Sequence, residues 1–307
     1  MPVTDENEIE PQDGSDIIST IDINIQDVAE NALLKQLIKN DARHGCVVLM
    51  EVETGEIRAI ANLTRTDSGM YAENYNYVIG ESTEPGSTFK LASLMVALED
   101  GLIDMDDTIN TKNGKLKFYN EEMKDSHEGG YGRITVKQVF EKSSNVGVSK
   151  IIFEKYAKDP QKFIDGLCHM NLCEQLKLDI PGAGTPKIKS PSNTSWSDVS
   201  LPWMSIGYEL TMTPLQMLTF YNAVANNGKM VKPMFVKEII QKGKTIRKFH
   251  PEVINPAICS QATIKKAKEM MEGVVEQGTA TNLKSAEYKI AGKTGTAQIA
   301  NGKYGYK

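Results

Sequence analysis

Near the N-terminus, the spacing of apolar residues predicts a helix followed by a hairpin. In residues 24–40 apolar positions recur every three or four residues, the period of an amphipathic helix, and Asn24 is its candidate N-cap. Residues 45–52 and 57–61 are rich in β-branched and apolar residues and enclose a short turn around Gly55. Two such runs around a glycine turn predict an antiparallel β-hairpin.

A buried helix is predicted next. The residues from Phe89 to Leu98 are largely apolar, Pro85 and Gly86 set up a turn before them, and Gly101 stands where the helix would end. The serine that follows Gly86 therefore lies at the start of this helix.

The middle of the chain is predicted to be mainly helical. Capping-box patterns open helices at residues 135–138 and 213–216, and Ser260 precedes a last long helix that ends near Gly278. Residues 178–202 are rich in Pro, Gly and Ser, which predicts a long irregular excursion. Short strands are expected at residues 232–240 and 244–247, and a final strand with two glycines at residues 288–299.

The order of these elements indicates an α/β (α+β) fold whose sheet is built from both ends of the chain. We expect an antiparallel sheet flanked by helices, with an all-helical subdomain inserted between its parts. The sheet subdomain is assigned to residues 18–86 and 262–307, and the helical subdomain to residues 87–261. Residues 1–17 carry six acidic residues and no basic one, which predicts a disordered leader before the domain at 18–307.

The composition is that of an ordinary globular protein. The chain has 307 residues, of which 40% are hydrophobic and 24% charged, with a formal net charge of −5. The leader supplies this negative charge, so the body is nearly neutral, and no basic block indicates nucleic acid as a partner. No apolar run reaches the ~18 residues of a membrane span and no signal peptide precedes the leader, so this chain is predicted to be soluble.

The four cysteines are too few for a disulfide framework in a chain of this size. Cys46 opens an apolar strand and is predicted to be a buried thiol. Cys168, His169 and Cys173 are metal ligands by type, but no second pair stands at a recognisable spacing. We therefore expect neither a metal nor another cofactor.

Ser87 and Lys90 form the first candidate catalytic pair. Residues three apart lie on one face of a helix, so the Lys90 amine can reach the Ser87 hydroxyl, which sets a nucleophile beside a candidate base. The free N–H groups and positive dipole end at a helix start favour the oxyanion that forms when a serine attacks a carbonyl. Alone, this pattern is weak, because about one chance match is expected in a chain of this length.

Two further motifs follow in order. Ser143 and Asn145 form a Ser-x-Asn motif, and residues 293–296 read Lys-Thr-Gly-Thr. Taken singly, the first fits a helix-capping pair and the second an exposed edge strand protected by a lysine. Together with the Ser-x-x-Lys motif they form the ordered set that occurs in penicillin-binding proteins and class A β-lactamases.

The chain resembles the class B penicillin-binding proteins, specifically the division-type peptidoglycan D,D-transpeptidases. The resemblance covers roughly residues 15–307 and is carried by residues 84–90, 142–147, 207–216 and 291–298. It implies the transpeptidase fold shared with serine β-lactamases, and an enzyme that cross-links peptidoglycan stem peptides during septal wall synthesis.

The same resemblance implies a role for each motif residue. Ser87 would be acylated by a stem peptide that ends in D-Ala-D-Ala, and Lys90 would take its proton. Lys90 must then be neutral, which desolvation and the nearby cation of Lys293 favour. Ser143 would relay a proton to the leaving amine, and Asn145 would hold Lys90 and the substrate amide.

The third motif is expected to bind the terminal carboxylate of the substrate. Lys293 and the hydroxyls of Thr294 and Thr296 would receive it, while Gly295 lets the substrate lie against the strand edge. Alternation along a strand directs Lys293 to one side and the two threonines to the other. Lys293 would then have to bend around the edge to share the site.

The implied partners are donor and acceptor stem peptides, β-lactam antibiotics and membrane proteins of the division machinery. The implied location is an extracytoplasmic (periplasmic) domain of a protein anchored in the inner membrane. Two alternatives remain, a β-lactamase and a β-lactam sensor or scaffold. The first needs a water-activating glutamate after Tyr156, and Glu174 lacks the asparagine that β-lactamases pair with it. The intact motifs disfavour an inactive scaffold, but a sensor also acylates.

The chain ends fourteen residues after Lys293. The resemblance implies further strands and a closing helix beyond this point. We therefore expect a fragment whose apolar sheet edges are exposed unless a neighbour covers them.

Overall fold

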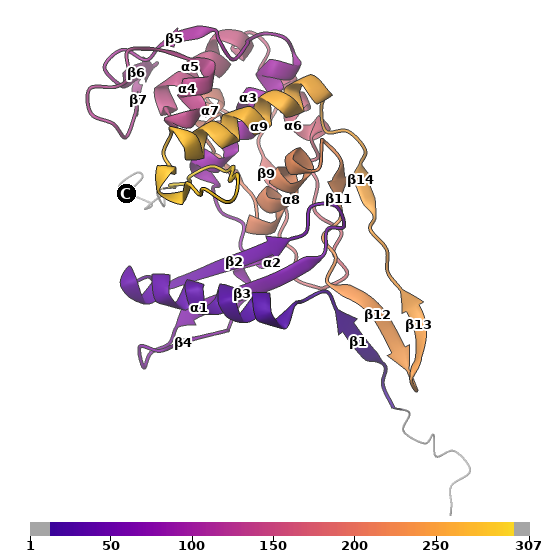
Figure 1. Cartoon of the computed structure of the whole chain (residues 1–307). Coiled ribbons are helices and arrows are strands. Elements are labelled where there is room, and N and C mark those ends of the chain that lie inside the picture. Colours follow the sequence, from indigo (N-terminus) through magenta and orange to yellow (C-terminus); the bar gives the residue numbers. More distant parts are fainter. Residues whose placement is uncertain (1–12, 298–307) are drawn as a thin grey trace, which may run out of the picture.

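The computed structural model describes residues 13–297 (Figure 1). Its N-terminal part is a helix on a small sheet: α1 (Ile23–Lys39) lies against β2 (His44–Met50) and β3 (Ile57–Arg65). These strands pair antiparallel, and β4 (Tyr71–Ala72) extends the sheet in the order β2-β3-β4. The predicted helix and hairpin are confirmed.

The cap of α1 differs from the sequence prediction. Asp22, not Asn24, is the N-cap, and its carboxylate accepts hydrogen bonds from the backbone N–H groups of Asn24 and Ile25. Both residue types are good caps, so the pattern alone does not choose between neighbouring candidates.

A second sheet pairs a strand near the start of the described chain with two strands that lie far along the sequence. β1 (Asp16–Ser19) pairs with β12 (Val236–Gln241), which pairs with β13 (Lys244–Lys248). β1 therefore begins two residues inside the range expected as a disordered leader, and residues 1–12 of that range lie outside the described residues. Residues 16–19 form a strand because their backbone groups hydrogen-bond with β12, a partner that the local sequence does not indicate.

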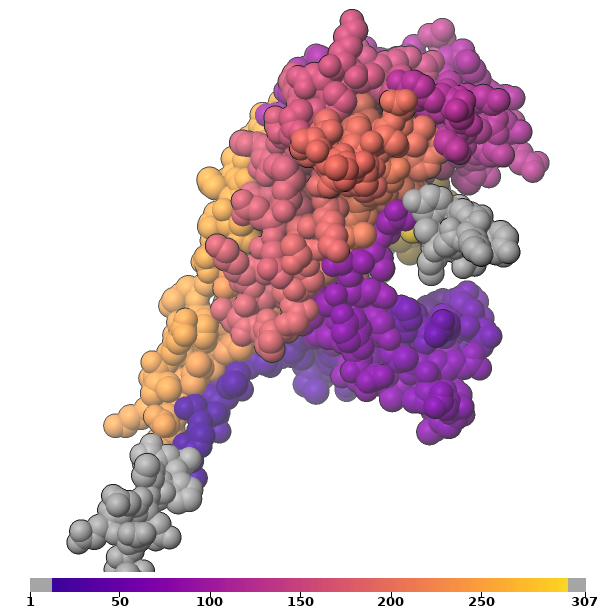
Figure 2. Space-filling view, turned by 180° about the vertical axis from the view of Figure 1, so that it is seen from behind, coloured from indigo at the N-terminus to yellow at the C-terminus, as the bar shows by residue number. Residues whose placement is uncertain are grey.

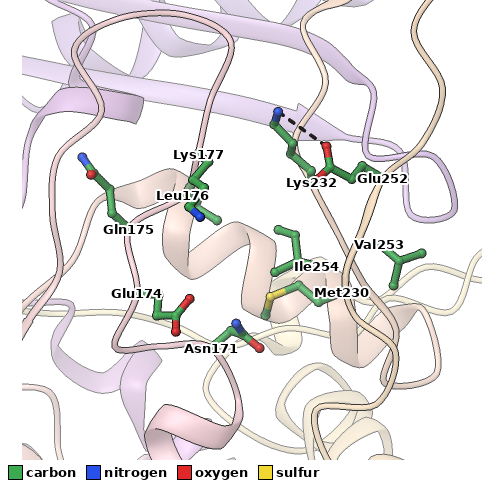
Figure 3. Close-up of a pocket in the computed structure, with 10 residues that line it drawn as sticks. All are labelled: Asn171, Glu174, Gln175, Leu176, Lys177, Met230, Lys232, Glu252, Val253 and Ile254. Atoms are coloured by element: carbon green, nitrogen blue, oxygen red, sulfur yellow. Dashed lines mark ion pairs between the residues drawn. The ribbon is translucent and has the colours of Figure 1, made fainter.

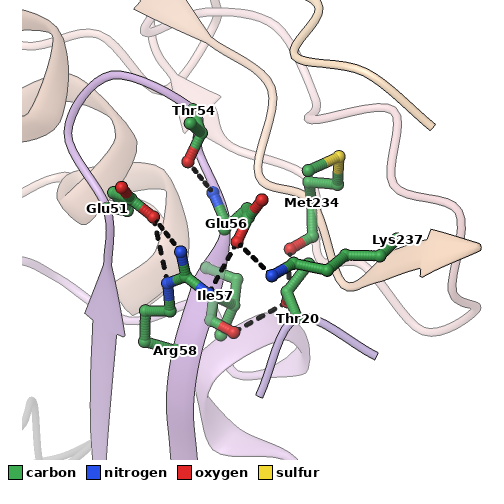
Figure 4. Close-up of polar contacts among 8 residues, drawn as sticks. All are labelled: Thr20, Glu51, Thr54, Glu56, Ile57, Arg58, Met234 and Lys237. Atoms are coloured by element: carbon green, nitrogen blue, oxygen red, sulfur yellow. Dashed lines mark hydrogen bonds and ion pairs between the residues drawn. The ribbon is translucent and has the colours of Figure 1, made fainter. Parts of the chain in front are cut away.

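Polar contacts hold this second sheet to the first (Figure 4). Thr20 Oγ1 lies 2.7 Å from the carbonyl oxygen of Ile57 and 2.9 Å from that of Met234. The side chain of Glu56 is only 13% exposed and lies 3.1 Å from Lys237 Nζ. Glu56 is poorly solvated, so its ion pair with Lys237 and the hydrogen bonds of Thr20 hold the start of β3 beside β12.

The second part of the molecule is built around one buried helix. In α3 (Lys90–Glu99) every residue from Lys90 to Leu98 is buried. It is preceded by a 3₁₀ turn, η1 (Gly86–Phe89), and followed by Gly101, whose φ of +65° suits a helix stop. Five further helices of this part are α4 (Val136–Glu141), α5 (Asn145–Tyr156), α6 (Pro160–His169), α7 (Ser200–Met204) and α8 (Pro214–Ala225).

The predicted capping boxes are confirmed at the starts of α4 and α8, and Ser260 caps α9 (Gln261–Glu276). However, α9 contacts α3, α4 and α8 and so lies in the helical part (Figure 1), not in the sheet subdomain to which residues 262–307 were assigned. Its apolar face is buried there, which includes Met270 and Val274.

The helical part also carries short strands that the sequence did not predict. They pair as β5 with β8, β6 with β7, β9 with β10 and β11 with β14. Their bounds, with the two remaining helical turns, are β5 (Thr108–Asn110), β6 (Lys115–Phe118), β7 (Glu121–Lys124), β8 (Arg133–Thr135), β9 (Lys187–Ile188), β10 (Leu210–Thr211), β11 (Met230–Val231), β14 (Val253–Asn255), α2 (Tyr77–Gly80) and η2 (Thr281–Leu283).

The predicted final strand is not formed. Residues 288–297 have no strand conformation, and the last two residues of the expected strand lie outside the described residues. Gly292 N–H instead donates to the carbonyl oxygen of Met271 on α9, at 3.2 Å. A strand needs a neighbour to complete its hydrogen bonds, and in residues 13–297 no strand runs beside this segment.

The two parts meet over a restricted region, and the surface beside it is deeply indented (Figure 2). β2 is the outer strand of its sheet, and Leu49 on it is 40% exposed. α1 exposes Val28 at 71% and Ile38 at 62%. Apolar exposure is thus concentrated on the N-terminal part. Within residues 13–297, no helix combines the length and apolarity needed to cross a bilayer.

Candidate active site

Ser87 lies in η1, so the predicted helix start is confirmed, with a 3₁₀ first turn in place of an α-helical one. The turn depends on Gly86, which has a φ of +55°. A Cβ at this position would also lie 2.5 Å from the carbonyl oxygen of Thr296. The glycine therefore lets the C-terminal segment approach the backbone next to Ser87.

Lys90 is completely buried. Its Nζ lies 2.7 Å from the carbonyl oxygen of Ser143, 3.2 Å from Ser143 Oγ and 2.6 Å from Asn145 Oδ1. These three acceptors match the three donors of an ammonium group. Among the residues that the structure describes, no hydrogen bond joins Lys90 Nζ to Ser87 Oγ. In this arrangement the amine faces the second motif.

The second motif is a tight turn between α4 and α5. Ser143 has a φ of +56°, and Ser144 is the N-cap of α5, with its Oγ accepting from Gly147 N–H at 2.9 Å. Asn145 Nδ2 donates to the carbonyl oxygen of Lys124 at 2.8 Å. This contact orients the amide so that its oxygen faces Lys90.

Lys293 reaches the same turn from the C-terminal segment. Its Nζ lies 2.7 Å from Ser143 Oγ and 2.9 Å from the carbonyl oxygen of Thr294. The Thr294 hydroxyl lies 2.7 Å from that of Thr279. Strand alternation would have separated Lys293 from Thr294, but the segment is not a strand, so both side chains face the site.

Burial and charge shift the acid–base properties of both lysines. Burial first, and the charge of Lys293 second, hold the pKa of Lys90 well below its ordinary value, while the charge of Asp125 opposes this. Burial lowers the pKa of Lys293 to about 8. Lys293 thus stays mostly protonated at neutral pH, and Lys90 is disposed to lose its proton.

These residues surround a cavity of about 560 Å³. Five of the sequence-predicted site residues line it: Ser87, Ser143, Asn145, Thr294 and Thr296. Lys90 and Lys293 both contact Ser143, which lines the cavity. A Cβ at Gly295 would lie 3.0 Å from Cγ2 of Thr88, the residue after the nucleophile. All eight predicted residues therefore come together.

Sequence reasoning missed the other lining residues: Lys124, Asp125, Ser126, Tyr208 and Thr279. They lie in turns or at the ends of short elements, remote in sequence from the motifs. Only Tyr208 falls inside a segment that carried the family resemblance, residues 207–216.

A second cavity, of about 260 Å³, lies between the loop at residues 171–177 and the strands β11 and β14 (Figure 3). Glu174 lines this cavity and not the one around Ser87. A water-activating role for Glu174, as the β-lactamase alternative requires, has no support from this placement.

Two of the three candidate metal ligands are bonded to each other. Cys168 and Cys173 form a disulfide, so neither offers a thiolate. Within residues 13–297, no group of three or more His, Cys, Asp or Glu side chains is placed to hold a metal ion. Cys46 is a half-buried free thiol, and burial raises its pKa to about 11.

Residues 45–307 match the family model of the penicillin binding protein transpeptidase domain. The chain belongs to this family. Among curated relatives of the transpeptidase family, it is 29% identical to the probable peptidoglycan D,D-transpeptidase PenA of Neisseria flavescens, over 96% of the chain and 70% of PenA. It is also 29% identical to the peptidoglycan D,D-transpeptidase FtsI of Escherichia coli, over 96% of the chain and 48% of FtsI. The chain thus spans about half the length of FtsI.

Solved transpeptidase structures confirm the mixed α/β fold. Penicillin binding protein 3 of Mycobacterium tuberculosis, complexed with ampicillin, superposes with a TM-score of 0.82 at 28% identity, covering 95% of this chain and 66% of that one. The transpeptidase domain of Burkholderia pseudomallei penicillin-binding protein 3 gives a TM-score of 0.77 at 26% identity, covering 94% and 80%. The expected membership in the class B penicillin-binding proteins is confirmed.

Proposed function

We propose that this chain is the catalytic domain of a serine D,D-transpeptidase, which cross-links peptidoglycan stem peptides through an acyl-enzyme on Ser87. The observation that carries the proposal is that Ser143 Oγ lies between two lysine amines, at 3.2 Å and 2.7 Å, in the cavity that Ser87 lines. Relatives named D,D-transpeptidases, and the aztreonam and ampicillin complexes of the M. tuberculosis protein, support it.

In the first step, Ser87 Oγ attacks the carbonyl carbon of the bond between the two terminal D-Ala residues. Lys90, as a neutral amine, takes the hydroxyl proton. A C–O ester bond forms and the C–N bond breaks, and Ser143 relays the proton held by Lys90 to the leaving D-Ala amine. Because a neutral amine has two donors and a lone pair, loss of its proton frees Lys90 from one of its three present contacts.

The substrate carboxylate is bound by the third motif. Lys293 supplies the cation, and the hydroxyls of Thr294 and Thr296 supply donors. The absence of a side chain at Gly295 leaves room for the peptide. The backbone N–H groups of Ser87 and Thr296 stabilise the oxyanion of the tetrahedral intermediate.

In the second step, an amine of another stem peptide attacks the ester carbonyl. A new peptide bond forms, the C–O ester bond to Ser87 breaks, and a proton lost by the attacking amine returns to the Ser87 oxygen. β-Lactams acylate Ser87 as mimics of D-Ala-D-Ala. We further propose that the domain acts outside the cytoplasm, in a membrane-anchored protein of septal wall synthesis with divisome membrane proteins as partners, because its motifs resemble those of division-type enzymes.

The proposal is tested by intact-mass analysis after incubation with a penicillin. We expect one adduct on the chain and none on a Ser87→Ala variant, because alanine has no nucleophile. Transfer is tested separately with a stem-peptide analogue as donor and a D-amino acid as acceptor. Acylation with transfer supports the transpeptidase, acylation without transfer favours a sensor, and rapid release of the adduct by water favours a β-lactamase.

A further inference from the structure

Asp125 is the acidic residue among those that line the cavity of Ser87 in the described chain. It follows β7, and its own N–H donates to the carbonyl oxygen of Gly114 at 2.9 Å. Its carboxylate accepts from Ser144 Oγ at 3.0 Å to each oxygen and from Val146 N–H at 2.9 Å. The proposed reaction assigns no role to this residue.

These contacts place the carboxylate at the N-terminus of α5, a 12-residue helix, where a negative charge is favoured by the helix dipole. Ser144, which Asp125 binds, is completely buried and stands between the two residues that contact Lys90. Lys124, the residue before Asp125, holds Asn145 Nδ2 through its carbonyl oxygen. Two adjacent residues at the end of the β6–β7 hairpin, Lys124 and Asp125, therefore hydrogen-bond to the turn at residues 143–145.

Asp125 also supplies negative charge to a site that holds two lysines. The charged or titratable groups that face Lys90 are Lys293, from the C-terminal segment, and Asp125, from the end of β7. Asp125 in turn faces Lys90 and Tyr131. Burial raises the pKa of Asp125, although hydrogen bonds from Val146 and Ser144 and the charge of Lys90 favour its ionised form.

We propose that Asp125 is a positioning residue of the acylation reaction: its carboxylate holds the Ser143–Asn145 turn against Lys90 and sets the pH at which Lys90 becomes the base. This inference rests on the proposed function, since it assumes that Lys90 takes the proton of Ser87. The two effects act in different ways. Loss of the hydrogen bonds loosens the turn, whereas loss of the charge removes the anion that stabilises the protonated amine.

The test is the rate of penicillin acylation between about pH 5 and about pH 9, measured by intact mass on the whole chain and on Asp125→Asn. The amide keeps an acceptor for Val146 N–H but removes the charge. We expect the acidic limb of the profile to move down by about one pH unit, because Lys90 loses its proton more easily without the anion. The maximal rate should fall, because the amine is then a weaker base.

Glu128→Gln is the matched control, because it removes one negative charge from an exposed residue close by in sequence. Its profile should coincide with that of the parent chain. Ser144→Ala separates the two effects, since it keeps the carboxylate and its contact with Val146 N–H but removes the hydrogen bond from Ser144 Oγ. We expect a several-fold lower maximal rate in Ser144→Ala with an unmoved acidic limb.

The outcomes distinguish a failure of the proposed function from a failure of the inference about Asp125. A parent chain that folds but forms no adduct contradicts the proposed function, and this inference with it. An adduct on the parent chain with an unmoved acidic limb in folded Asp125→Asn contradicts this inference alone. If thermal melting shows that Asp125→Asn does not fold, Ser144→Ala decides, because an unchanged maximal rate there contradicts the positioning role.

Discussion

Lys293 Nζ and Ser143 Oγ lie 2.7 Å apart, although 150 positions separate the two residues in the chain. Lys90 Nζ approaches the same hydroxyl at 3.2 Å from the buried helix α3. One hydroxyl therefore links a lysine with a strongly lowered pKa to a lysine that stays mostly charged at neutral pH. In the proposed reaction, the first is the base and the second binds the substrate carboxylate.

Replacing Lys293 should change both the rate of acylation and its pH dependence. In Lys293→Met we expect penicillin acylation to slow by roughly 10- to 100-fold, because the carboxylate loses a charged partner. The acidic limb should move to higher pH, since the charge of Lys293 lowers the pKa of Lys90 and its removal lets that pKa rise. This shift is opposite in sign to that expected for Asp125→Asn.

The measurement is the same intact-mass time course at a series of pH values. Lys289→Met serves as the control, because Lys289 is an exposed lysine of the same segment. An acidic limb that stays in place or moves down in Lys293→Met would show that the two amines are not coupled.

Gly86→Ala should impair acylation more than its backbone strain alone explains. Alanine at a positive φ costs about 1–3 kcal/mol of stability, and here its Cβ would also meet the carbonyl oxygen of Thr296 at 2.5 Å. The C-terminal segment must then move away from Ser87, so we expect a large loss of penicillin acylation with a lower melting temperature.

Gly101→Ala is the matched control for Gly86→Ala. Gly101 also has a positive φ, +65°, but no atom lies within 4 Å of a Cβ built there. It should lose a similar amount of stability in thermal melting and keep its acylation rate. Equal acylation rates in the two variants would argue against the close approach of Thr296 to the nucleophile's turn.

The Cys168–Cys173 disulfide should stabilise the fold modestly. It closes a short loop with a sequence separation of 5, and a loop of that size is expected to contribute about 2 kcal/mol by restricting the unfolded chain. We expect reductant to lower the melting temperature of the parent chain. The Cys168→Ser, Cys173→Ser double variant should melt at that lower temperature with or without reductant, and a reductant effect of the same size in this variant would contradict the assignment.

The capping boxes and the first hairpin were predictable because they depend on neighbouring residues. The capping boxes at the starts of α4 and α8 are made by residues three apart, so their sequence pattern is their hydrogen-bond pattern. The hairpin around Gly55 is likewise local. Where two good caps stand close together, as Asp22 and Asn24 do, the choice depends on how the helix sits on the sheet, and the prediction was wrong.

Features that depend on distant partners were not predictable. Asp125 meets Ser144 across 19 positions and Thr279 meets Thr294 across 15, and nothing in either local sequence marks these pairs. The disulfide between Cys168 and Cys173 is short in sequence, but a count of cysteines does not show which of them pair. The segment at residues 288–297 has the composition of a strand but no neighbouring strand in the described chain, and composition cannot supply one.

By itself, the sequence determined the chemistry of the site: which side chains are present, the order of the three motifs and the helix that begins at the nucleophile. These follow from residue types and from interactions within one or two helical turns. Only the tertiary structure decided that Lys90 and Lys293 both contact the Ser143 hydroxyl, and that Asp125 binds the turn at residues 143–145. Such contacts depend on how the packing of α3, α4, α5 and the C-terminal segment brings remote residues together, which a pattern read along the chain does not contain.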